Sequence, residues 1–151
     1  KFSEIEENIE VFKSFPNVTR VVGAFTVQAN NIMQIDKVID YFINKLGIVF
    51  YSHRVTYPMS LSAQVLPPEL KVKVVNRLEQ MKTEVLKYPL VQQHKLLETV
   101  TLQQIQDNIN FLESKCMYDT HWQDCINFNR ALDKTRSQDF LTTNPEFEPY
   151  V

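Results

Sequence analysis

Glycine is scarce in this 151-residue chain, which contains only Gly23 and Gly47. An ordinary protein contains about 7% glycine, several times more than this. Phosphate-binding loops of the types GxxxxGK[ST] and GxGxxG need several glycines within a few residues, because bare backbone must approach the phosphate closely. The sequence therefore excludes both of these classes of nucleotide-binding loop.

Cysteine is equally scarce, with Cys116 and Cys125 as the only two residues of that type. Two cysteines do not make a disulfide framework, so free, buried thiols are the expected state. Together with His121 they form the pattern Cys-x4-His-x3-Cys, which is similar to part of a zinc site. Because a structural zinc site needs four ligands, we favour packing of Cys125 with Trp122 on one helix face over metal binding.

Excess charge and long apolar runs are also missing. The formal net charge of −2 gives no electrostatic basis for nucleic-acid binding. No apolar run approaches the ~20 residues that span a bilayer, and no secretory signal is recognisable. We therefore expect a cytoplasmic protein that binds neither nucleic acid nor membrane. Because the chain begins with Lys1 rather than Met, we also expect it to be processed or to belong to a longer polypeptide.

A strand–helix–strand pattern occupies the first part of the chain. Residues 19–28 are apolar on both faces, which is typical of a strand in a parallel sheet covered by helices. Apolar residues then recur at helical spacing over 31–46, with Asn31 placed to cap the helix start and Gly47 to end it. A second buried strand is expected to start at 48–51. This order predicts an α/β fold with a parallel strand pair.

The remainder of the sequence is mainly helical in pattern. Capping boxes at Ser3-x-x-Glu6 and Thr101-x-x-Gln104 predict two helix starts. The expected helices cover residues 4–15, 68–86, 101–112 and a last segment from about 122 to beyond 136, with an extended segment at 61–66 and an irregular tail at 141–151. Two or three parallel strands do not form a stable sheet alone, because both edges would be exposed. We therefore expect the sheet to continue in residues outside this chain.

Four segments of the sequence resemble one protein family in their order and spacing. They are Thr26-Val27-Gln28, the stretch from Tyr57 to Pro67, the stretch from Leu132 to Phe140, and Pro145-Glu146-Phe147. Together they are similar to the carboxyl-terminal part of the twitch-domain-containing radical SAM proteins of bacteria and marine phages. Asp133 and Arg136 could pair across one helical turn, but the family-like position of this run suggests instead that it docks the last helix on the barrel.

The resemblance implies a fold of radical SAM type. Residues 1–88 would form the late strand–helix units of a partial (β/α) barrel, with two to three parallel strands, and residues 89–151 a helical extension packed on it. Family members cleave S-adenosylmethionine reductively at a [4Fe-4S] cluster, and the resulting radical abstracts a hydrogen atom from the substrate. Three cysteines in a CxxxCxxC run hold that cluster, and this chain has no such run. The chain would therefore contribute a cavity wall, while the rest of the polypeptide or a complementary subunit supplies the cluster, in the host cytoplasm if a phage encodes it.

Polar residues at the ends of the two expected strands are the candidate ligands for that cavity. The resemblance assigns contacts with S-adenosylmethionine to Gln28, Asn30 and Tyr57, and contacts with an unidentified substrate to His53 and Arg54. The alternative roles are helix capping for Gln28 and Asn30, and a solvated pair on the barrel rim for His53 and Arg54. Because side chains alternate along a strand, at most one of His53 and Arg54 can face the cavity.

A second hypothesis comes from a different functional class. The chain could be a non-catalytic α/β interaction module, or a degenerate remnant, that binds a protein partner through its exposed sheet edge. The sequence upstream of Lys1 discriminates between the two hypotheses. A CxxxCxxC run there favours the enzyme, whereas a start codon immediately before Lys1 favours the module.

Overall fold

The fold is α/β and mostly helical, with one small parallel sheet. The computed structural model describes residues 2–151, so the expectations about Lys1 lie outside the described residues. The strands β1 (Val22–Val27) and β2 (Val49–Arg54) pair in parallel, with Val22 opposite Val49 and Val27 opposite Arg54. The expected parallel strand pair is thus confirmed.

Helices account for most of the remaining chain. They are α1 (Phe2–Ser14), α2 (Ile35–Asp40), α3 (Pro68–Val85), α4 (Pro89–Gln93), α5 (Lys95–Ser114), α6 (Tyr118–Arg136) and α7 (Phe140–Thr143). Shorter helical turns lie at Ile32–Gln34, Tyr41–Lys45, Met59–Leu61, Ala63–Val65 and Pro145–Tyr150. Within residues 2–151, no helix combines the length and the apolar character needed to cross a membrane.

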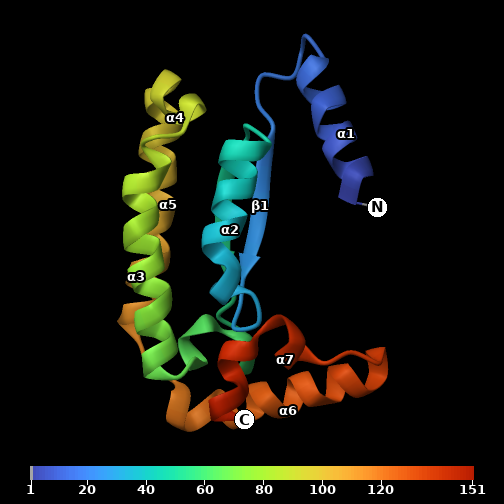
Figure 1. Ribbon diagram of the computed structural model, residues 1–151, viewed down its shortest axis with the longest axis vertical. Helices are drawn as coiled ribbons and strands as arrows, with labels where there is room; N and C mark the ends of the chain where they lie inside the picture. Colours follow the sequence, from blue (N-terminus) through green and yellow to red (C-terminus); the bar gives the residue numbers. More distant parts are fainter. Residues whose placement is uncertain (1) are drawn as a thin grey trace.

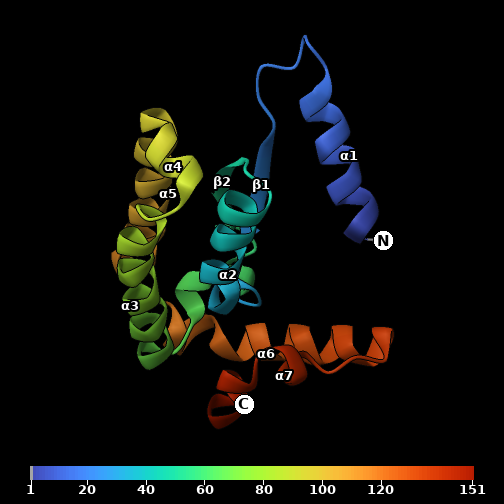
Figure 2. The same cartoon turned by 45° about the horizontal axis from the view of Figure 1, so that its top comes forward.

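The helices are arranged in layers around the strand pair (Figures 1 and 2). Helix α2 contacts α3, while α5 contacts both α3 and β2, and α1 lies on the other side of β1 in both views. Helices α6 and α7 run across the end of the molecule at which β1 terminates (Figure 1). The core lies between α2, β2, α3 and α5 and includes the fully buried side chains Ile39, Ile43, Phe50, Leu78 and Ile105.

The connection between the strands follows the predicted pattern except at its start. Gly47 has a φ of 60° and ends the helical segment, as expected for a glycine that caps a helix. Asn31 does not cap the helix with its side chain. Its Nδ2 instead donates to the carbonyl of Thr26 at 2.9 Å, and its Oδ1 accepts from the amide of Gln28 at 3.0 Å. Asn31 therefore closes the end of β1 rather than opening the next helix.

The predicted capping box at Thr101 is wrong, because α5 already begins at Lys95 and Thr101 is fully buried inside it. Gln104 has a different role. Its Oε1 accepts hydrogen bonds from the backbone amide of Ser52 at 2.8 Å and from the Ser52 hydroxyl at 2.9 Å, while Asn108 Nδ2 donates to the same hydroxyl at 2.8 Å. These contacts close the outer edge of β2 at Ser52. The expectation that both sheet edges are exposed therefore fails at Ser52, although β2 remains an edge strand.

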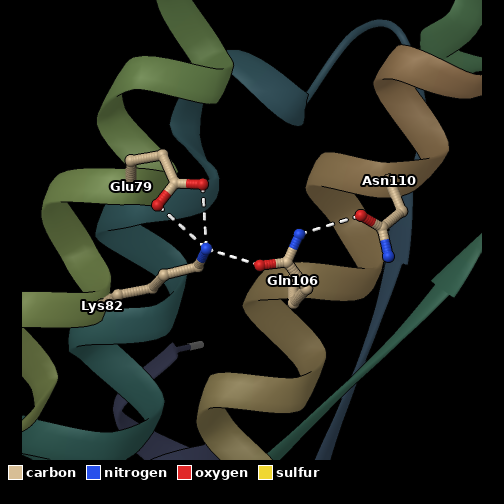
Figure 3. Close-up of polar contacts among 4 residues, drawn as sticks. All are labelled: Glu79, Lys82, Gln106 and Asn110. Atoms are coloured by element: carbon tan, nitrogen blue, oxygen red, sulfur yellow. Dashed lines mark hydrogen bonds and ion pairs between the residues drawn. The ribbon is translucent and has the colours of Figure 1, made fainter.

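A polar network joins α3 to α5 (Figure 3). Lys82 Nζ on α3 lies 2.8 and 2.9 Å from the two carboxylate oxygens of Glu79 and 2.5 Å from Gln106 Oε1 on α5. Gln106 Nε2 in turn donates to Asn110 Oδ1 at 2.8 Å. Two of the three ammonium contacts stay within α3, and the one with Gln106 joins α3 to α5.

Helix α1 is attached to the rest of the fold by polar contacts. The predicted capping box at Ser3 is wrong, because the helix already begins at Phe2 and Glu6 has other partners. The Glu6 carboxylate accepts from the Tyr41 hydroxyl at 2.5 Å and from Lys45 Nζ at 2.6 Å. Four apolar side chains of α1 and its end are each about half exposed: Ile5, Val11, Phe12 and Phe15. This apolar surface has no cover among the described residues.

The carboxyl-terminal tail is more regular than expected. Helix α6 ends where Ser137 adopts a φ of 52°, and the tail then folds back as α7 and a 3₁₀ segment. Phe147 is fully buried and packs edge-on against Trp122 at 5.4 Å, and Trp122 Nε1 donates to the carbonyl of Tyr150 at 2.8 Å. Likewise, the segment expected to be extended at 61–66 contains short 3₁₀ turns and is mostly buried.

Candidate functional site

One face of the sheet is open. On the face toward α2, Val27 and Phe50 are fully buried and Ser52 is 7% exposed. The opposite face carries Val22, Ala24, Thr26, Val49, Tyr51 and His53, all of them exposed or partly exposed. The apolar composition of residues 19–28 predicted a strand covered on both faces, and within residues 2–151 that expectation is wrong. We call these six residues the open face.

Two polar residues of the open face lie side by side at the carboxyl end of the sheet. Thr26 and His53 are register partners, and both are exposed. Gln28 follows β1 and is partly exposed, and Tyr57 follows β2 and is 85% exposed. The predicted site residues Gln28, His53 and Tyr57 therefore lie at the same end of the sheet. Thr26 was not predicted as a site residue. Strand alternation, which places it two positions before Gln28, could have identified it.

Asn30 has a partner elsewhere in the fold. Its Nδ2 donates to Asn129 Oδ1 at 2.6 Å, and Asn129 Nδ2 donates back to Asn30 Oδ1 at 3.0 Å. Asn129 is 2% exposed and also donates to the carbonyl of Cys125 at 2.9 Å. This reciprocal amide pair links the end of β1 to α6, so the side chain neither caps α2 nor extends freely toward the open face.

Arg54 lies on the opposite side of β2 from His53. It pairs in register with the buried Val27, and its Nη1 atom is buried without a hydrogen-bond partner among the described residues. The prediction that at most one of His53 and Arg54 faces the same cavity follows from this alternation. His53 is the one on the open face.

The residues of the open face can bind a ligand but form no recognisable nucleophile–base pair. The hydroxyl, imidazole and phenol groups of the open face, with the amide of the adjacent Gln28, hydrogen-bond and stack, which suits a nucleoside or a sugar. Within residues 2–151, no group of three or more His, Cys, Asp or Glu side chains is placed to hold a metal ion. Burial raises the pKa of Cys125 to about 12, which opposes the thiolate form that an iron–sulfur cluster requires. Cys116 is exposed and unbridged, so the two cysteines do not fit a cluster.

Two hollows lie at opposite ends of the sheet. The larger, of about 540 Å³, is at the amino end and is lined partly by Val21, Ile48, Leu90 and Leu96. The second, of about 390 Å³, is at the carboxyl end between α6 and α7, and Asn30 forms part of its wall. The larger hollow thus lies opposite the end at which the sequence predicted a ligand.

The run from Leu132 to Phe140 contributes to the second hollow. Asp133 Oδ2 accepts from the backbone amide of Phe140 at 2.9 Å, so Asp133 joins α6 to α7. Arg136 is exposed and makes no ion pair with Asp133 or with any other described residue. The possible pairing of these two residues is therefore absent, and the contact of Asp133 joins α6 to α7 without testing the expected docking of the helix on the barrel.

Comparisons of this chain with protein-family models, with curated proteins and with solved structures found no match. The geometry of the open face and the order of the sequence motifs are therefore the basis for a functional proposal.

Proposed function

We propose that this chain forms the late strands of a partial (β/α) barrel in a radical SAM enzyme, where it supplies one wall of the cavity for S-adenosylmethionine and the substrate. The observation that supports this proposal most directly is a parallel strand pair with helices on one face only. A doubly wound sheet has helices on both faces, so its strands are buried on both sides. In a (β/α) barrel the helices lie outside, and the other face of every strand turns inward.

The position of the polar groups supports the same proposal. In (β/α) barrels the ligand site lies at the carboxyl ends of the strands. Thr26 and His53 occupy that end of the open face, with Gln28 and Tyr57 next to it. The apolar surface of α1 and the unpaired edge of β1 would both be covered by a further strand–helix unit beside β1.

The role of this chain in that enzyme is to bind and orient. The His53 imidazole and the Gln28 amide would hydrogen-bond the ribose or the base edge, and the exposed Tyr57 ring would stack on a planar group. The bound S-adenosylmethionine supplies the radical precursor. Because the cysteines of this chain do not fit a cluster, the cluster ligands would come from the rest of the polypeptide or from a complementary subunit. Free cysteines agree with a reducing, cytoplasmic location.

The experiment uses the full-length polypeptide, purified and reconstituted with iron and sulfide without oxygen. Formation of 5′-deoxyadenosine from S-adenosylmethionine, measured by chromatography, is the readout. His53→Leu should lower the yield at limiting S-adenosylmethionine by up to about tenfold, which corresponds to the loss of one hydrogen bond. His94→Leu is the matched control, because His94 is also exposed but lies at the amino end of the sheet. Absence of a CxxxCxxC run from the full-length polypeptide, or equal yields for the two variants, would contradict the proposal.

The interaction module is a second candidate, favoured by the same unpaired edge of β1 and by the exposed apolar side chains of α1. A strand from a partner protein could pair with that edge. Iron content separates the two candidates. A full-length polypeptide that retains no iron after reconstitution and forms no 5′-deoxyadenosine favours the module.

A further inference from the structure

The hollow between α6 and α7 has the composition of a small binding site. Its volume of about 390 Å³ lies within the range of about 300–1,000 Å³ that is typical of pockets for small ligands. Its wall includes the carboxylates of Asp133 and Asp139, the guanidinium of Arg136 and the amide of Asn144. We call it the α6–α7 groove.

The side-chain oxygen of Asn144 accepts no hydrogen bond in the fold. The residue is 2% exposed, and its Nδ2 donates to the carbonyl of Phe140 at 3.2 Å and to Thr143 Oγ1 at 3.1 Å. These two bonds fix which end of the amide is oxygen. Its Oδ1 is buried without a hydrogen-bond partner among the described residues. A buried amide oxygen is costly to leave unpaired, and because Asn144 lines the groove we take this oxygen as the acceptor for a ligand donor.

The two carboxylates of the groove accept fewer hydrogen bonds within the protein than they have acceptor sites. Asp133 accepts one backbone amide, and Asp139 accepts the amide of Leu141 at 3.0 Å and the hydroxyl of Thr142 at 3.4 Å. A carboxylate has about four acceptor sites, so both can still accept hydrogen bonds. Arg136 is exposed and makes no ion pair within residues 2–151.

We propose that the α6–α7 groove binds a small zwitterionic α-amino acid. The ammonium group would donate to Asn144 Oδ1 and to the adjacent carboxylates, and the carboxylate group would pair with Arg136. Leu132 and Phe140 line the same groove and would contact an apolar side chain. A phosphate or another anion would meet two carboxylates and one guanidinium, whereas a simple amine would leave the guanidinium unmatched. A zwitterion matches both signs of charge.

L-leucine is the probe, because it carries both charged groups and an apolar side chain of moderate size. Two analogues with the same carbon skeleton are the ligand controls. The analogue 4-methylpentanoate lacks the ammonium group, and 3-methylbutylamine lacks the carboxylate. Isothermal titration of the chain should show binding of leucine and binding at least about tenfold weaker for each analogue, because each loses its charge-assisted hydrogen bonds.

Variants of the chain provide the second arm. Arg136→Met should weaken leucine binding by about tenfold or more, whereas Arg130→Met should leave it unchanged. Arg130 is the matched control because it is exposed on the same helix but does not line the groove. Asn144→Ala should also weaken binding, with circular dichroism to confirm that the variant folds. If Asn144→Ala unfolds, the proposal is still tested by the binding of the two analogues and by leucine binding to Arg136→Met.

Three results would overturn the inference. The first is no detectable binding of leucine, which would mean that Asn144 Oδ1 serves only a trapped water molecule. The second is equal binding of leucine and either analogue. The third is equal binding by the Arg136→Met and Arg130→Met variants. None of these results depends on S-adenosylmethionine, so the inference and the proposed enzyme function can fail separately.

Discussion

Replacing Gln104 with Met removes the acceptor that closes the outer edge of β2. The two side chains have similar volume, so the change leaves the packing of α5 nearly intact. The backbone amide of Ser52 then loses its partner at 2.8 Å, and Ser52 is only 7% exposed. The Ser52 hydroxyl keeps its hydrogen bond from Asn108. A buried amide without an acceptor costs about 1–3 kcal/mol, and we expect the free energy of unfolding to fall by that amount.

Urea unfolding followed by far-UV circular dichroism measures this loss, and the midpoint should move to lower urea without a change in slope. Gln103→Met is the matched control, because Gln103 is the neighbouring residue on α5 but is exposed, and its side chain bonds only to Asp107 at 2.8 Å. The control should stay within about 0.5 kcal/mol of the parent chain. Hydrogen exchange of the Ser52 amide gives a local readout, because exchange should accelerate in Gln104→Met alone.

Equal unfolding midpoints for the Gln104→Met and Gln103→Met variants would refute this reasoning. The same holds if the Ser52 amide exchanges rapidly in the parent chain. Either result would mean that the contact between β2 and α5 does not close the sheet edge in solution.

Three further expectations follow from the packing and the buried thiol. Gly23→Ala should lower the unfolding free energy by about 1–3 kcal/mol, because the added Cβ would lie 2.5 Å from the Phe42 ring, and Phe42→Leu should restore part of the loss; an unchanged urea midpoint would contradict this. Stability should decrease as the pH rises above 9.0, because burial raises the pKa of Cys125 from 9.0 to about 12 and the unfolded thiol therefore ionises first; this loss should shrink in Cys125→Ala, and an identical pH profile would refute the assignment. Iodoacetamide should alkylate the exposed Cys116 in the native chain and the buried Cys125 only after unfolding, as mass spectrometry can determine; equal labelling of both in the native chain would count against the buried position of Cys125.

Local signals predicted the elements of the fold well. The apolar strands, the glycine at the end of the connecting helix and the proline at the start of α3 each act within a few residues, and the structure shows all of them. The capping pattern at Thr101 failed because the residues before it also form helix, so that α5 starts six residues earlier at Lys95. Local sequence patterns could not predict that Gln104 accepts a hydrogen bond from Ser52, because the two residues are 52 positions apart.

In the candidate site, too, local patterns predicted some features, whereas contacts between distant residues could not be predicted. Strand alternation correctly separates His53 from Arg54, because it needs only the period of the strand. The partner of Asn30 lies 99 residues further along the chain, so its engagement with Asn129 could not be anticipated from the sequence. The unpaired oxygen of Asn144 depends on how the tail folds back over α6, and no periodicity predicted that path.

The closure of β2 at Ser52 also limits how copies of this chain can associate. A strand pair with two free edges can add a partner on both sides, and repeated addition leads to a fibre. Here Gln104 blocks the outer edge of β2 at Ser52, whereas the edge of β1 is open along its length among residues 2–151. We therefore expect self-association through the sheet to use the edge of β1 and to stop at a pair of chains. Concentrated solutions of this chain should reach a constant dimer mass in sedimentation equilibrium, and the Gln104→Met variant should continue to larger species.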